Sequence, residues 1–169
     1  MLSNASILTT LIHIEGQYNA AIAPMDNFYS KLAILEACGW IEEAMDDVLE
    51  RSMNYKIKKS KDVDFVSKKI LENYGFDYSG NFRKVLTYIL GLWNIGKMER
   101  RLDPLKFARL VSQLGNLKQV RDSAAHTHVQ VGITQYYDGP SVTRQRLLHV
   151  TDGLADIEQV LISMKLTKL

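Results

Sequence analysis

The amino-acid sequence predicts an all-α fold, a helical bundle of about five to seven helices, and three observations favour it. Apolar residues recur at helical spacing along most of the 169 residues. Proline occurs only three times, each time where a helical pattern begins or ends. With 46% hydrophobic and 24% charged residues, the composition is that of one soluble globular domain whose core needs no disulfide or metal ion. We therefore expect a single helical domain over residues 1–169.

The first half of the chain is predicted to contain three helices. Apolar spacing favours a helix over residues 6–22, because Pro24 interrupts the pattern. A long helix begins near Asp26, a possible N-cap, and presents one apolar stripe that we expect in the core: Phe28, Leu32, Leu35, Ile41, Met45, Val48, Leu49 and Met53. A short helix follows over residues 62–74, and Gly75 ends it.

A fourth helix is predicted to begin at Asn81. Its apolar positions recur on one face, and we expect them to point inward: Phe82, Val85, Leu86, Ile89, Leu90, Trp93 and Met98. Two glycines, Gly91 and Gly96, weaken this helix, each by about 1 kcal/mol relative to alanine.

The remaining helices are bounded by strong local signals. Asp103 and Pro104 form a good N-cap and first-turn pair, and an apolar stripe of Phe107, Leu110, Val111 and Leu114 continues to Gly115. Asn116 then begins either a fresh helix or the continuation of a kinked one. The β-branched segment near 129–137 is predicted to be extended. A last helix follows Pro140 and buries Leu147, Leu154, Ile157, Leu161 and Met164.

Several functional classes lack their signatures. The sequence has no GxxxxGK[ST], HExxH or CxxC, and its four histidines show no metal-site spacing, so we expect no metal ion and no other cofactor. The lone Cys38 suits a reducing cytoplasm. No apolar run reaches the roughly 18 residues of a membrane span, and the N-terminus lacks a secretory pattern. We therefore expect a cytoplasmic protein with no membrane partner. Its net charge of +2 permits a phosphate-bearing partner.

The densest cluster of catalytic residue types lies at the end of the helix that precedes the extended segment. Asp122 and His126 are four residues apart, so on a helix the carboxylate can hold the imidazole. Arg121 and His126 are about 140° apart around a helix, and they converge only if the helix ends near Ala125 or a second subunit supplies the partner group. His128 is a secondary candidate for the proton-transfer residue.

These residue types suit metal-free RNA cleavage. An arginine fork binds a phosphodiester through paired hydrogen bonds, and histidine moves protons at neutral pH, while the 2′-hydroxyl of the RNA attacks the adjacent phosphate. Arg144 and His149 repeat the spacing. They lack an acidic neighbour and lie inside a helical pattern, so we interpret that copy as chance.

The segment Arg121-Asp122-x-x-x-His126 in an all-helical chain of this length resembles the motif of the HEPN superfamily. The stretch from Leu35 to Glu43 is similar to the corresponding helix of the RiboL-PSP-type branch. The resemblance implies a homodimer in which two motifs form one composite, metal-independent endoribonuclease site, in toxin–antitoxin, abortive-infection or other antiviral settings. It implies that Arg121 binds the phosphate, Asp122 orients and His126 transfers protons.

Two alternatives remain open at this point. One is a catalytically inactive helical module that binds RNA or a partner protein, with the basic run Lys56, Lys58, Lys59 and Lys61 contacting phosphates or simply forming a solvated loop. The other is a toxin subunit whose site an antitoxin, such as a partner nucleotidyltransferase, modifies or covers.

Overall fold

The structure is a computed structural model that describes residues 3–126 and 136–168. All regular structure in these residues is helical, which confirms the predicted all-α bundle. The seven α-helices of the described ranges are α1 (Ala5–Ala20), α2 (Met25–Lys56), α3 (Ser60–Leu71), α4 (Arg83–Leu90), α5 (Leu92–Glu99), α6 (Pro104–His126) and α7 (Pro140–Ser163). A π-helical turn, η1 (Tyr78–Phe82), leads into α4.

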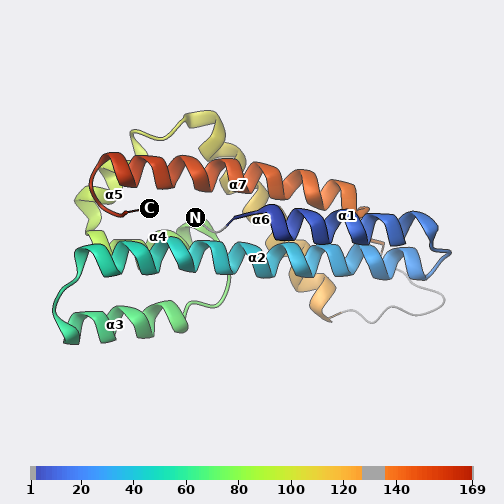
Figure 1. Cartoon of the computed structure of the whole chain (residues 1–169), viewed down its shortest axis with the longest axis horizontal. Coiled ribbons are helices and arrows are strands. Elements are labelled where there is room, and N and C mark those ends of the chain that lie inside the picture. The colour runs from blue at the N-terminus through green and yellow to red at the C-terminus, as the bar shows by residue number, and fades with distance from the viewer. Residues whose placement is uncertain (1–2, 127–135, 169) are drawn as a thin grey trace.

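The long helix α2 organises the bundle. It packs against α1, α6 and α7 along most of its length, and against α3 and α4 near its C-terminal end (Figure 1). The core between α1, α2, α6 and α7 is made of fully buried aliphatic side chains, including Leu11, Ile41, Leu114 and Leu154. Because α2 touches both groups of helices, it joins the two ends of the molecule as one rigid element.

Helices α6 and α7 approach each other closely at Gly153. A Cβ atom added there would lie 2.6 Å from the Cβ of Leu110 on α6, well inside van der Waals contact. Only glycine permits the two helices to pack this closely, because a Cβ atom cannot move away from its neighbour without a shift of the backbone that carries it. The contact fixes the position of α6, which carries Arg121.

The predicted first two helices differ from the structure at their ends. Helix α1 stops at Ala20, and Ile22 lies exposed beyond it. Asp26 is not the N-cap of α2, because the helix begins one residue earlier and the Asp26 carboxylate accepts from the adjacent Asn27 N–H. Phe28, predicted to be core, is exposed, since it lies in the first turn with its ring edge-on against Tyr29. Helix α3 ends at Leu71, before the predicted stop, and Gly75 follows in the loop with a φ of +106°.

The helix predicted from Asn81 to Met98 is two helices. Gly91 has a φ of +79°, a left-handed conformation that ends α4 and redirects the chain into α5. Trp93 was expected inward, but the change of direction leaves it 71% exposed. The other six residues of that stripe are buried as predicted.

The boundaries of α6 and α7 match local rules. The Asp103 carboxylate accepts hydrogen bonds from the N–H groups of Leu105 and Lys106, which confirms it as the N-cap residue of α6. Helix α6 runs through Gly115 without a break, so no fresh helix begins at Asn116. Val111 is exposed, unlike the rest of its stripe.

Helix α7 begins at Pro140 as predicted and buries Leu147, Leu154, Ile157 and Leu161, while Met164 is half-buried just beyond it. Most of the predicted extended segment near 129–137 lies outside the described residues. Its last two residues, Tyr136 and Tyr137, have no regular secondary structure.

Candidate active site

Arg121 lies on α6 where that helix packs against α2. Leu117 and Ala124, one turn before and one turn after it, are fully buried, so the inner stripe of α6 carries the stem of Arg121 to the α2 boundary. Its Nη2 donates to the Glu42 carboxylate of α2 at 2.6 Å. Its guanidinium carbon lies 5.7 Å from the centre of the Phe76 ring. The arginine is therefore held from two sides, yet its side chain remains 31% exposed and open to a solvent-borne ligand.

Asp122 is turned towards Arg121. Its exposed carboxylate accepts a hydrogen bond from Arg121 Nη1 at 3.2 Å. Within the part of the chain that the structure describes, no hydrogen bond joins Asp122 to His126, although the two are four residues apart on one helix. The guanidinium attracts the carboxylate more strongly than the exposed ring does, since it carries a permanent charge.

His126 is the last residue of α6 and is exposed. Because α6 remains helical up to this residue, Arg121 and His126 of one chain point about 140° apart around the helix axis. A single chain therefore does not bring the two side chains together. His128 lies outside the described residues.

The basic run lies at the other end of α2. Lys56 is the last residue of α2, Lys58 and Lys59 form the connection to α3, and Lys61 is in the first turn of α3; all four are exposed. Lys56 and Lys58 donate to the backbone carbonyls of Lys165 and Asn54. The structure does not bring this run together with Arg121, because about four turns of α2 separate Lys56 from Glu42.

Sequence reasoning missed the two residues that hold Arg121, Glu42 and Phe76. Both are distant from Arg121 along the chain, and no local pattern pairs them with it.

Cys38 lies one turn before Glu42 on α2 and is buried next to α6. Its thiol contacts the Leu117 carbonyl with 3.9 Å between sulfur and oxygen. Burial raises the pKa of this thiol to about 12, and the positive charge of Arg121 offsets only part of that effect. The thiol therefore stays protonated and is a packing group, not a nucleophile.

A row of carboxylates continues along α2 from Glu42. Burial raises the pKa of Asp46 to about 6, and the neighbouring charges of Glu50 and Glu42 add to the effect. Among the described residues, no group of three or more histidine, cysteine or acidic side chains is arranged to hold a metal ion.

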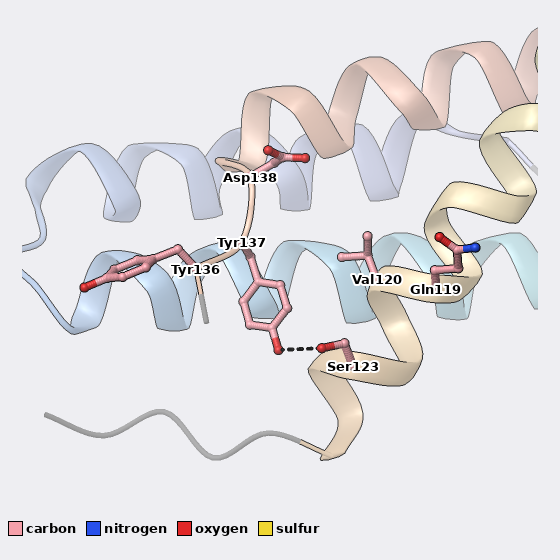
Figure 2. Close-up of a pocket in the computed structure, with 6 residues that line it drawn as sticks. All are labelled: Gln119, Val120, Ser123, Tyr136, Tyr137 and Asp138. Carbon is pink, nitrogen blue, oxygen red and sulfur yellow. Dashed lines mark hydrogen bonds between the residues drawn. The ribbon is translucent and has the colours of Figure 1, made fainter. Parts of the chain in front are cut away.

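A pocket of about 210 Å³ opens between α6 and the segment that leads into α7 (Figure 2). It is lined by Gln119, Val120, Ser123, Tyr136, Tyr137 and Asp138. The hydroxyls of Ser123 and Tyr137 are 3.4 Å apart across it. Ser123 is about 200° around α6 from Arg121, so this pocket opens on another side of the helix from the arginine.

The second arginine–histidine pair has a different environment. Both residues lie inside α7, and Arg144 is paired with Glu15 of α1, with 3.0 Å between nitrogen and oxygen. Arg144 therefore ties α7 to α1, and the pair serves below as a control for the first one.

Comparisons with protein families, curated proteins and solved structures give no match. Within the described ranges, none of the helices is both long and apolar enough to cross a membrane. The fold and the candidate site therefore describe a helical bundle with an anchored, partly exposed arginine near the end of α6.

Proposed function

We propose that the protein is a metal-independent endoribonuclease that acts as a homodimer. The observation that carries the proposal is the setting of Arg121: a guanidinium anchored by Glu42 and Phe76, one third exposed, on the helix that ends at the exposed His126. An anchored arginine binds phosphate with little loss of side-chain freedom, because its fork is already oriented.

The chemistry follows from these two side chains. Arg121 binds the phosphodiester and stabilises the charge that develops on its non-bridging oxygens. The 2′-oxygen forms a bond to phosphorus while the bond to the 5′-oxygen breaks. One imidazole removes the proton of the 2′-hydroxyl, and another delivers a proton to the leaving 5′-oxygen. The products are a 2′,3′-cyclic phosphate and a 5′-hydroxyl, and no metal ion takes part.

The dimer follows from the angle between the two side chains. Since Arg121 and His126 of one chain diverge by about 140°, a second chain is needed to place an imidazole beside the phosphate on Arg121. Two copies of α6 that meet near their C-terminal ends would bring two arginines and two histidines to one site. A protein that cleaves RNA in this way fits a toxin or antiviral effector, which an antitoxin restrains by covering Arg121.

The test compares the two arginine–histidine pairs. Arg121→Ala and His126→Ala should each lower RNA cleavage by at least about 100-fold, the order expected for loss of a charge stabiliser or a positioned acid–base group. Arg144→Ala and His149→Ala should leave cleavage near wild type once thermal melting shows that each variant is folded. Cleavage should persist in excess chelator and stop when the RNA lacks its 2′-hydroxyls.

Equal losses in both pairs, or cleavage that depends on neither, would overturn the proposal. A strict monomer at tens of micromolar, measured by light scattering, would overturn the composite site.

A second candidate function is a catalytically inactive module that binds RNA. It is favoured by the two carboxylates on Arg121, since Glu42 and Asp122 occupy both terminal nitrogens of the fork. RNA binding without cleavage by the wild-type protein, in an assay that detects cyclic phosphate ends, would select this function over the first.

A further inference from the structure

A groove of about 480 Å³ lies beside the C-terminal end of α2 and is also lined by α3 and α4. This end of α2 is opposite to the end that follows α1 (Figure 1). Its walls combine three lysines with two aromatic side chains: Lys56, Lys58, Lys59, Phe65 and Tyr88. We call it the lysine–aromatic groove. It is separate from Arg121, and nothing in the proposed mechanism uses it.

The two aromatic rings are exposed and fixed. Phe65 of α3 and Tyr88 of α4 are 52% and 46% exposed. Their ring centres are 6.0 Å apart and their planes meet at 81°, an edge-to-face pair. The next residues along each helix, Val66 and Ile89, are buried and line the same groove. The core therefore holds both helices in place while each ring keeps a surface open to solvent.

Positive charge surrounds the rings. The three lysines of the groove are exposed, and among the described residues that line it Asp62 is the one acidic side chain. Lys69 of α3 also has its Nζ 5.8 Å from the centre of the Phe65 ring, but Glu72 balances its charge through an ion pair with 2.9 Å between nitrogen and oxygen. A concave surface with excess positive charge and accessible ring faces has the two properties that bind single-stranded nucleic acid, since phosphates pair with lysines and bases stack on aromatic rings.

We propose that the lysine–aromatic groove binds single-stranded RNA, with bases stacked on Tyr88 and Phe65 and phosphates on Lys58 and Lys59. A single strand is required because the bases of a duplex are already stacked on each other and paired. The choice of RNA as the nucleic acid rests on the proposed function, but binding in this groove does not depend on cleavage at Arg121.

The experiment measures binding of a fluorescent 2′-O-methyl oligoadenylate of about 12 nucleotides by anisotropy, a strand that cannot be cleaved through its 2′-oxygens. Tyr88→Ala and Phe65→Ala should each weaken binding by at least about five-fold, the lower end of the value of one stacked base. Tyr88→Phe, which keeps the ring, should bind like the wild type. The matched control is Trp93→Ala, which removes a still more exposed ring on α5 that also lies under a lysine, Lys97, and should have no effect.

Charge is tested separately through the salt dependence. Replacing both Lys58 and Lys59 with glutamine should reduce the slope of log affinity against log salt by about 1.4, since each phosphate contact on a single strand contributes about 0.7. Lys97→Gln, a control that removes one positive charge away from the groove, should leave the slope unchanged.

Three results would overturn the proposal: wild-type affinity in both Tyr88→Ala and Phe65→Ala, an equal loss in Trp93→Ala, or equal affinity for a strand that has the phosphates but no bases. The second result would mean that binding is not confined to the groove, and the third would indicate attraction by charge alone. Arg121→Ala should remove only the phosphate contact at its own site, and the remaining binding should still depend on Tyr88 and Phe65. If the protein binds the strand through Tyr88 but cleaves no RNA, the proposed nuclease activity is refuted and the proposed binding groove is supported. If it cleaves RNA while Tyr88→Ala and Phe65→Ala leave binding unchanged, the binding groove is refuted and the nuclease activity is supported.

Discussion

Replacing Glu42 with glutamine should strengthen the binding of a phosphate at Arg121. The carboxylate lies 2.6 Å from Arg121 Nη2, at one of the positions that a phosphate oxygen would take. Glutamine keeps an oxygen that can accept the same hydrogen bond, so the arginine stays in place while the negative charge is lost. Whether the phosphate displaces this carboxylate or binds beside it, the removal of its charge favours the phosphate.

The magnitude follows from the distances and the exposure. A phosphate hydrogen-bonded to Arg121 would place its charge about 5 Å from Glu42, where like charges repel by about 0.8 kcal/mol in water and about 3 kcal/mol at an effective dielectric constant near 20. The side chains of Arg121 and Glu42 are 31% and 38% exposed, so solvent screens part of this repulsion. We expect a gain of about 1–2 kcal/mol, or roughly five- to thirty-fold in affinity.

The assay is anisotropy with the uncleavable oligonucleotide at low salt, repeated near 1 M salt, where the gain should shrink because the Debye length falls to about 3 Å. Glu43→Gln is the control, since it makes the same charge change on the adjacent, exposed residue, which points about 100° away around α2. Unchanged or lower affinity in a folded Glu42→Gln protein would refute the reasoning and would mean that the charge of Glu42 is needed to hold Arg121 in a binding position.

Two further predictions concern stability and do not depend on the function. Gly153→Ala should lower the free energy of unfolding by about 1–3 kcal/mol in a denaturant titration, because its new Cβ would overlap Leu110. The control, Gly39→Ala on the open face of α2, should raise the free energy of unfolding by up to about 1 kcal/mol. Stabilisation by both substitutions would show that α6 and α7 separate at little cost. Asp46→Asn should raise the free energy of unfolding by about 1 kcal/mol at pH 7, because burial raises the pKa of Asp46 to about 6, which means that the ionised carboxylate is less stable in the folded protein than in the unfolded chain. Below about pH 6 the folded protein protonates Asp46 and loses this penalty, so the gain should fade as the pH falls from about 7 towards about 4; a gain that is constant with pH would contradict this cause.

How much of the fold could be predicted from sequence depended on whether the signal was local. The Asp103 cap and the start of α7 at Pro140 rest on a few adjacent residues, and both were predicted correctly. Trp93 was placed wrongly because the periodic pattern continues through Gly91, and the pattern carries no information on the positive φ that redirects the chain there.

The candidate site shows the same limit. The cluster of Arg121, Asp122 and His126 is visible because its members are close in sequence. Glu42, which contacts Arg121 from 79 positions earlier in the chain, is one acidic residue among several on α2 until packing selects it. The side-chain environment of the arginine is therefore a tertiary property, and so is the pairing of Phe65 with Tyr88 across α3 and α4.

The length of α2 sets a minimum size for an RNA that uses both ends of the molecule. Glu42, beside the arginine, and Lys56, at the lysine–aromatic groove, are 14 residues apart on one helix, which corresponds to about 21 Å along its axis. A strand whose bases remain stacked advances about 3.4 Å per nucleotide, so about six nucleotides separate the two contacts. Shorter oligonucleotides would reach one site or the other, and a plot of affinity against strand length should therefore rise steeply once both are spanned.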